Sequence, residues 1–305
     1  MTLGHAVAAD RAAESPARPG YLERLAARSA ATRTVLCLGV DPDPRALPPG
    51  FSPDLAGVEA FAAILLEAAS PFAAAVKPNL AFFEAFGSAG MAALERLRSR
   101  LPGHVPVVMD AKRGDIGTTA ARQAAALYDG LGADAITVSP YLGQEAIRPL
   151  LERVDRFAYV LCRTSNPGAA ELQGLTVAAD DAAGHPAEPL YARVARRAID
   201  WGPGGTVGLV VGATAPAELA QIRAIAPGLA FLVPGVGAQG GDEAAVLRDG
   251  PATAAPASDG PGGGLLVNVS RGIAGAASGE DATDDVGDAL AAAAREWAAR
   301  LPVLP

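Results

Sequence analysis

Apolar runs rich in β-branched residues alternate along the chain with longer Ala- and Leu-rich segments of helical periodicity. The runs predict eight strands, over residues 34–40, 72–77, 105–110, 135–139, 157–163, 207–212, 230–234 and 265–270. Helices are expected over residues 55–69, 89–101, 118–131, 144–154, 189–201, 217–225, 243–248 and 284–300, with an additional helix over 21–31 ahead of the first strand. Because the strands are apolar almost throughout, they indicate a parallel sheet that is buried on both faces.

The number of β–α units distinguishes two parallel architectures. Eight units favour a closed (β/α)₈ TIM barrel with an extra N-terminal helix. An open doubly wound sheet would carry a glycine-rich dinucleotide fingerprint after its first strand, and the Gly39-Val40-Asp41-Pro42 segment there does not match it. We expect a single barrel domain over residues 21–305, a mobile leader over 1–20, and a flexible Pro/Gly/Ala-rich insertion over 250–264.

Composition narrows the class of protein. The 305 residues carry a formal net charge of −8, which argues against a nucleic-acid-binding protein, because such a protein needs a basic face. No apolar stretch approaches the roughly 18–20 residues that a membrane span requires, and the first residues lack the pattern of an export signal. Cys37 and Cys162 lie within apolar runs, where a disulfide is not expected. These features predict a cytoplasmic protein with no membrane or nucleic-acid partner.

Only two of the 25 basic residues are lysines, Lys77 and Lys112. In a chain that uses arginine for nearly every positive charge, the two lysines mark positions where a guanidinium cannot substitute. Lysine presents a compact ammonium group that can release its proton, which arginine does not do. The alternative is that both are accidental survivors of a coding bias, so their position along the chain must distinguish the two interpretations.

Both lysines belong to a polar set that follows the predicted strands. The active site of a (β/α)₈ barrel lies at the carboxyl ends of its strands. Those ends carry Asp41, Lys77, Asn79, Asp110, Lys112, Asp115, Ser165, Gln239, Ser270 and Arg271. Asp110 and Lys112 are two residues apart, so both side chains point the same way while the strand continues. With Lys77 and Asp115 they predict an array of two ammonium groups and two carboxylates; the alternative, a structural ion-pair network, would add little stability.

The seventh and eighth strand ends predict a phosphate site. The Gly-rich segment 234–241 exposes backbone N–H groups, as does the turn at Ser270 and Arg271, and Arg271 can form a bidentate pair with phosphate oxygens. Loops after strands seven and eight are the usual phosphate position in this fold. Metal binding and nucleophilic catalysis are not expected, because the three histidines lack metal-ligand spacing and neither cysteine has a histidine nearby.

The motifs together resemble the orotidine 5'-phosphate decarboxylase family, in its second, high-GC bacterial subgroup. The resemblance rests on the segments KPNLAFFE, DAKRGDIG, TSNPGA, PGVGAQGG and SRGI, which occur in this order between residues 21 and 300. Two departures are the insertion at 250–264 and Asn79, where the more widespread subgroup has glycine. The resemblance implies conversion of orotidine 5'-phosphate to UMP and CO₂ without a cofactor or metal, as the last step of de novo pyrimidine synthesis. It also implies a homodimer, in which Asp115 and Thr119 complete the partner's site.

The same resemblance assigns roles to the candidate residues. It implies that Lys112 protonates C6 of the pyrimidine as CO₂ leaves, that Asp110 lies beside the substrate carboxylate, and that Lys77 holds the array and contacts the ribose. It further implies the binding contacts: Asp41 and Asp115 to ribose hydroxyls, Ser165 to the pyrimidine ring, and Gln239 and Arg271 to the phosphate. Two alternatives stay open: a Mg²⁺-dependent sugar-phosphate lyase of the same superfamily, and a non-catalytic barrel that binds a phosphate ligand.

Overall fold

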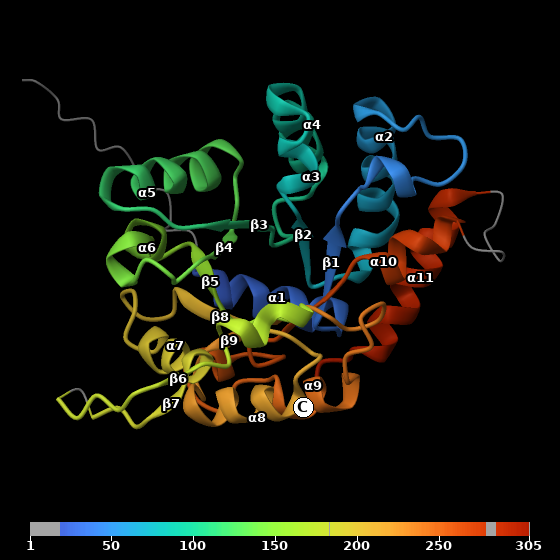
Figure 1. The fold of residues 1–305 in the computed structure, drawn as a ribbon. Helices are drawn as coiled ribbons and strands as arrows, with labels where there is room; N and C mark the ends of the chain where they lie inside the picture. The colour runs from blue at the N-terminus through green and yellow to red at the C-terminus, as the bar shows by residue number, and fades with distance from the viewer. Residues whose placement is uncertain (1–18, 183, 279–284, 305) are drawn as a thin grey trace, which may run out of the picture.

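Eight parallel strands form a barrel surrounded by helices in the computed structural model, which describes residues 19–182, 184–278 and 285–304 (Figure 1). The strands are β1 (Leu36–Val40), β2 (Ala75–Pro78), β3 (Val108–Arg113), β4 (Ala135–Val138), β5 (Phe157–Arg163), β8 (Val207–Val211), β9 (Ala230–Val233) and β10 (Leu266–Val269). They neighbour one another in the order β2-β1-β10-β9-β8-β5-β4-β3. Two isolated bridges, Val76 with Val107 and Asn79 with Asp110, join β2 to β3 and complete the ring. The predicted TIM barrel is confirmed.

The helices follow the strands in the expected alternation. They are α1 (Tyr21–Thr32), α2 (Leu55–Ala69), α3 (Ala81–Glu84), α4 (Gly87–Arg100), α5 (Gly117–Ala124), α6 (Gln144–Leu151), α7 (Leu190–Ala198), α8 (Pro216–Ile225), α9 (Glu243–Asp249), α10 (Arg271–Ala274) and α11 (Val286–Arg300). A π-helical turn, Ala125–Gly130, continues α5, and short 3₁₀ turns cover Pro44–Ala46, Ser70–Phe72, Pro167–Glu171, Ala257–Asp259 and Gly275–Ser278. Side-chain caps begin α2 and α11, where Asp54 and Asp285 accept backbone N–H groups of the first turn.

Helix α1 closes the end of the barrel opposite the carboxyl ends of the strands. Tyr21 stacks on Phe157, the first residue of β5, with ring centroids 4.8 Å apart. Arg24 donates a hydrogen bond of 2.7 Å to the fully buried carboxylate of Asp134, which directly precedes β4. Because both contacts lie at the amino ends of strands, the extra N-terminal helix seals the base and leaves the other end open. The expected leader, residues 1–20, lies outside the described residues except for Pro19 and Gly20.

The inserted segment 250–264 is packed against the base of the barrel. The backbone N–H of Ala252 donates to Gly263 and that of Thr253 donates to Pro227, while Ala257 is buried. The buried guanidinium of Arg223 donates to the Gly250 carbonyl and lies over the Phe231 ring. We expected a flexible loop from its Pro/Gly/Ala content, and these contacts give it a defined place that composition alone does not reveal.

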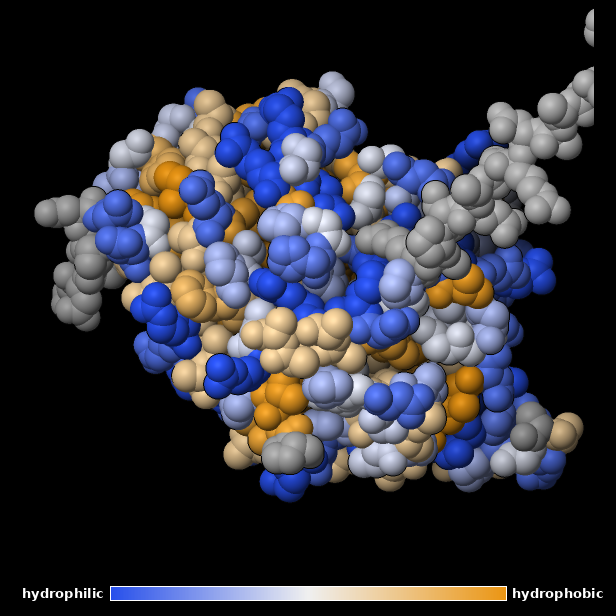
Figure 2. Space-filling view, turned by 180° about the vertical axis from the view of Figure 1, so that it is seen from behind, coloured by the Kyte–Doolittle hydropathy of each residue, from blue (hydrophilic) through white to orange (hydrophobic). Residues whose placement is uncertain are grey.

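One helical segment is longer and more apolar than the sequence pattern predicts for any part of the chain. Residues 55–72, which span α2 and the turn after it, have a mean hydropathy of 1.5 over 18 residues and are long and apolar enough to cross a membrane by length and composition alone. The expectation that no stretch approaches this length is therefore wrong. The apolar side chains of α2 that are buried, among them Phe61 and Leu65, join the main hydrophobic core. On the face drawn in Figure 2, hydrophobic residues form small separate patches among polar ones.

A small two-stranded hairpin lies outside the predicted elements. Strands β6 (Thr176–Val177) and β7 (Glu188–Pro189) pair antiparallel between β5 and α7. Glu188 is buried and accepts hydrogen bonds from Arg193 and Arg196 of α7. This pairing ties the hairpin to the outer helix, so the long connection after β5 is anchored on the side of the barrel.

Candidate active site

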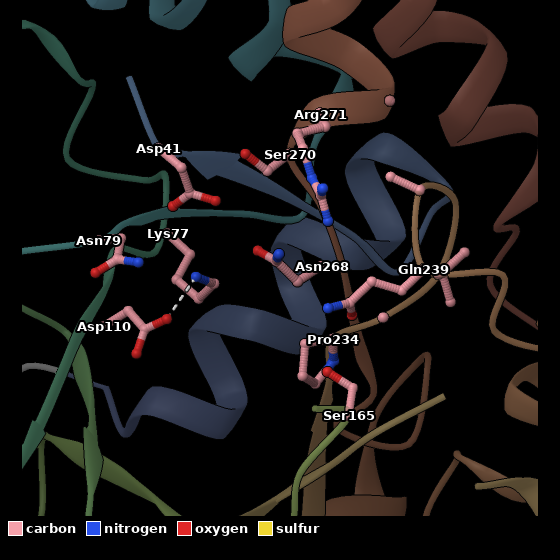
Figure 3. Close-up of a pocket in the computed structure, with 14 residues that line it drawn as sticks. Asp41, Lys77, Asn79, Asp110, Ser165, Pro234, Gln239, Asn268, Ser270 and Arg271 are labelled. Atoms are coloured by element: carbon pink, nitrogen blue, oxygen red, sulfur yellow. Dashed lines mark hydrogen bonds and ion pairs between the residues drawn. The ribbon is translucent and has the colours of Figure 1, made fainter. Parts of the chain in front are cut away.

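The carboxyl ends of the strands surround a polar cavity of about 190 Å³ (Figure 3). It adjoins a second, more apolar space of about 230 Å³, since Lys77, Asp110, Ser165 and Pro234 line both. The sequence predicted eight of the residues that line the first space: Asp41, Lys77, Asn79, Asp110, Ser165, Gln239, Ser270 and Arg271. Lys112 lines the second space. The structure therefore brings nine predicted residues from six strand ends into one hollow.

A chain of three charged groups occupies one side of this cavity. Lys77 on β2 donates to Oδ2 of Asp110 at 2.8 Å, and Lys112 donates to Oδ1 of the same carboxylate at 2.6 Å. Lys77 is buried, whereas the side chain of Lys112 is half-exposed. The predicted meeting of both lysines with Asp110 is thus present in the structure. Each ammonium group contacts one carboxylate oxygen, so a single acid separates the two positive charges.

Burial and charge act in opposite directions on the two buried groups. Burial alone would raise the pKa of Asp110, but the ammonium groups of Lys77 and Lys112 outweigh it and hold the pKa well below its usual value. Burial would likewise lower the pKa of Lys77, but the carboxylates of Asp110 and Asp41 raise it above its ordinary range. Both groups therefore stay ionised at neutral pH.

This ionisation predicts an acid-dependent stability. The folded-state pKa of Asp110 is lower than its unfolded value of about 3.9, so its stabilising effect is complete above that value and is lost as the pH falls through the folded pKa. We expect the free energy of unfolding to fall more between pH 6 and pH 3 in the wild type than in Asp110→Asn. The additional loss in the wild type should be about 1.4 kcal/mol for each pH unit that the experiment covers between the unfolded and the folded pKa of Asp110. Urea unfolding at each pH measures it, and equal slopes in the two proteins would contradict the assignment.

The opposite side of the cavity is formed by the loops after β9 and β10. Figure 3 shows Gln239 and Arg271 across the cavity from Lys77 and Asp110. Gly235 adopts a φ of +101°, and a Cβ atom there would lie 3.0 Å from both Oε1 of Gln239 and Cβ of Ser165. Glycine at this position therefore permits the left-handed backbone and the close approach of the two polar side chains.

One aromatic side chain contacts both of these loops. The indole N–H of Trp297, on α11, donates to the Gly272 carbonyl at 3.1 Å. A Cβ atom at Gly237 would meet the same indole ring at 3.2 Å. Trp297 thus packs under the loop that carries Gln239 and the turn that carries Arg271, which fixes the two loops relative to each other.

Two oxygen atoms that line the cavity have no hydrogen-bond donor among the described residues. They are Oδ1 of Asp41 and Oδ1 of Asn268, and both are buried. A buried acceptor without a donor is costly, so the two atoms are suited to accept hydrogen bonds from hydroxyl groups of a ligand. The sequence pattern does not single out Asn268, because this residue lies inside the apolar strand β10. Its position two residues before Ser270, on the same face of the strand, is the signal that could have identified it.

Asp115 and Thr119 do not line the cavity of their own chain. Oδ1 of Asp115 accepts the backbone N–H of Ile116, and Thr119 is exposed on the first turns of α5. Of the predicted array of two lysines and two carboxylates, one chain therefore brings Lys77, Asp110 and Lys112 together at the cavity, without Asp115. Across the described residues, no three His, Cys, Asp or Glu side chains gather closely enough to hold a metal ion.

Comparisons with known proteins agree with these motifs. Residues 34–286 match the family described as Orotidine 5'-phosphate decarboxylase / HUMPS family. The orotidine 5'-phosphate decarboxylase of Roseiflexus castenholzii is 46% identical over 282 residues, covering 92% of this chain and 95% of that protein. Its counterpart in Thermomicrobium roseum is 47% identical over 255 residues, covering 83% and 86%. The solved OMP decarboxylase of Leishmania donovani is 39% identical with a TM-score of 0.75, covering 92% of this chain and 96% of that one. The chain therefore belongs to the orotidine 5'-phosphate decarboxylase family and is a decarboxylase.

Proposed function

We propose that this enzyme converts orotidine 5'-phosphate to UMP and CO₂, without a cofactor, by electrostatic stabilisation of the electron pair that stays on C6 when CO₂ departs. The observation that carries the proposal is the separation of two kinds of group across one cavity. Lys77 and Asp110 lie on one side, and Gln239 and Arg271 lie on the other (Figure 3). Lys112 joins the first group through its hydrogen bond to Asp110. A nucleotide has the same layout, with a reactive ring at one end and a phosphate at the other.

The chemistry accounts for the lysines. When the bond between C6 and the carboxylate breaks, its electron pair stays on C6 in an orbital that the ring cannot delocalise, so charge must be stabilised at that atom. The ammonium group of Lys112 stabilises this pair and then gives C6 its proton, and solvent restores the proton to Lys112. Arginine is a much poorer acid and cannot replace it. Asp110 beside the substrate carboxylate adds a repulsion that ends when CO₂ departs.

Binding contacts follow from the remaining groups. We propose that Gln239 and Arg271 hold the phosphate, with the turn at Ser270 beside them, and that Ser165 bonds the pyrimidine ring. Asp41 and Lys77 contact the ribose, with Asn79 beside them. Distant contacts of this kind hold the ring in place while the reaction proceeds at C6.

An absorbance assay that follows the loss of orotidine 5'-phosphate tests the function. We expect turnover that is unchanged by a metal chelator. A Mg²⁺-dependent sugar-phosphate lyase would not decarboxylate this nucleotide, and a non-catalytic barrel would bind UMP without releasing CO₂. Either of these results would overturn the proposal.

The phosphate contact predicts a specific loss of affinity. Arg271→Ala should weaken UMP binding by about 10- to 100-fold, because a hydrogen-bonded charge pair with the phosphate is lost. Affinity for uridine, which has no phosphate, should not change. Calorimetric titration of both ligands measures this, with Arg248→Ala as the control, since Arg248 is exposed and pairs with Asp249. An unchanged UMP affinity in Arg271→Ala would count against the phosphate role.

We also propose a cytoplasmic homodimer built from single-domain chains (residues 21–305), in which Asp115 and Thr119 reach the partner's cavity and Asp115 accepts a ribose hydroxyl. Large hydrophobic side chains on the loops after β3 and β4 support a dimer face here: Ile116, Tyr141 and Leu142 are 62%, 80% and 55% exposed. Patches of this kind at the rim of a site mark protein contacts. Both cysteines are free and buried, which is typical of proteins in a reducing compartment.

Subunit exchange tests the shared site. Lys112→Ala and Asp115→Ala should each be inactive alone, yet mixing them should restore about a quarter of wild-type activity. The reason is that half of the dimers are then mixed, and each mixed dimer has one site with an intact Lys112 and an intact Asp115 from its partner. Mixtures that stay inactive under conditions of proven exchange would refute the shared site.

A further inference from the structure

The hydroxyl group of Thr137, in the middle of β4, contacts the catalytic strand β3 in three places. Thr137 is buried, with 2% of its surface exposed. Its Oγ1 accepts the backbone N–H of Ala111 at 3.1 Å and that of Lys112 at 2.9 Å. It lies 2.9 Å from Oδ1 of Asp110. A threonine hydroxyl has one proton and two acceptor positions. Because two N–H groups occupy both acceptor positions, its proton points to Asp110.

These contacts lie where the pairing between β3 and β4 is interrupted. Met109 is the partner of Ile136, and the next aligned pair is Arg113 with Val138. Three residues of β3, Asp110 to Lys112, therefore stand opposite one residue of β4, Thr137. A regular ladder would supply main-chain acceptors for the amides of Ala111 and Lys112. At this bulge the side chain of Thr137 supplies the acceptor instead.

The bulge also puts Lys112 in an uncommon backbone conformation. Its φ is +48°, in the left-handed region that side chains other than glycine rarely adopt. Strained positions of this kind persist only where surrounding contacts hold them. The hydrogen bond from the Lys112 amide to Thr137 is such a contact, and it acts on the residue whose ammonium group meets Asp110.

The carboxylate of Asp110 is fixed by the same hydroxyl. Its Oδ2 accepts from Lys77, and its Oδ1 accepts from both Lys112 and Thr137. Thr137 is the uncharged member of this set, and it is also the one that bonds the backbone of β3. It therefore ties the orientation of the acid to the position of the lysine.

We infer that Thr137 is a positioning residue for decarboxylation, which holds the bulge that carries Lys112 and orients Asp110. The inference rests on the proposed roles of Lys112 and Asp110. Thr137→Val keeps the shape of the side chain but leaves the backbone N–H groups of Ala111 and Lys112 without this acceptor. It also removes one of the two donors to Oδ1 of Asp110, so that only Lys112 still holds this oxygen. A misplacement of about 1 Å at a reacting group costs about 100-fold in rate. Phosphate binding across the cavity does not depend on this hydroxyl.

The test is a steady-state comparison of Thr137→Val with Thr137→Ser, which retains the hydroxyl. We expect kcat to fall by about 10- to 100-fold in Thr137→Val, with the dissociation constant for UMP within about threefold of wild type. Thr137→Ser should recover kcat to within about threefold. Thr206→Val is the matched control, because Thr206 is a buried threonine whose hydroxyl has no partner among the described residues, and it should keep wild-type kcat.

Three results would overturn the inference: a kcat in Thr137→Val close to wild type, an equal loss in Thr137→Ser, or a parallel loss of kcat and UMP affinity. If Thr137→Val does not fold, Thr137→Cys, which is a weak hydrogen-bonding isostere, carries the same expectation. Lys112→Ala measured alongside separates this inference from the proposed function. Wild-type activity in Lys112→Ala would contradict the proposed role of Lys112. An inactive Lys112→Ala together with an unaffected Thr137→Val would contradict only the role of Thr137.

Discussion

Lys112→Ala should lower kcat by at least about 10⁴-fold, because both the charge that stabilises the carbanion and the acid that protonates C6 are lost. The dissociation constant for UMP should change by less than about fivefold, since the Lys112 side chain is 51% exposed and exposed charges contribute little to binding. Single-turnover assays with excess enzyme measure the rate, and titration of UMP measures the affinity.

A second variant separates charge from proton donation. Lys112→Arg retains a positive group beside Asp110 but cannot release its proton near neutral pH. We expect its kcat to remain at least about 100-fold below wild type. Arg148→Ala is the control, because Arg148 is exposed and pairs with Glu152, the residue that follows the last residue of α6. Wild-type turnover in either Lys112 variant would show that another group protonates C6.

The strands and helices were predictable wherever burial alone determines them. Strand β5 and helix α2 begin and end at the predicted residues, since the first is an apolar run and the second has a continuous apolar face. Strand β3 was predicted over 105–110, yet it spans Val108–Arg113. Its polar half, from Asp110 onward, is held by Asn79 of the neighbouring strand end and by Thr137, and these contacts between strands leave no apolar signal. The β6–β7 hairpin was missed because its strands have two residues each.

The candidate site divides along similar lines. Charged residues at strand ends, such as Lys77 and Asp110, were predicted because a charged side chain next to a buried apolar strand is costly unless it has a function. Asn268 and Thr137 were missed because each lies within a run of aliphatic residues. Threonine is common in strands, so nothing local separates Thr137 from a structural residue. Its role depends on the bulge in β3, which only the register of the folded sheet reveals.

Asp110→Asn should lower kcat by about 10³-fold while it strengthens the binding of orotidine 5'-phosphate relative to UMP. Two unit charges about 4 Å apart repel by about 4 kcal/mol at an effective dielectric constant of 20, which corresponds to a factor of about 10³. UMP lacks the carboxylate, so only the substrate binds more tightly when the negative charge of Asp110 is removed. The measurements are kcat and KM for the substrate, and the inhibition constant of UMP.

The ratio of these two affinities distinguishes repulsion from positioning. If Asp110 only holds Lys77 and Lys112 in place, Asp110→Asn loses rate but binds substrate and product with the same relative affinity as the wild type. If it repels the carboxylate, the ratio moves toward the substrate, because the two ammonium groups then attract that carboxylate without opposition. Asp43→Asn is the control, since Asp43 pairs with Arg45 outside the cavity. A rate loss with an unchanged ratio would thus leave Asp110 as the group that aligns the lysines and would rule out repulsion as its contribution.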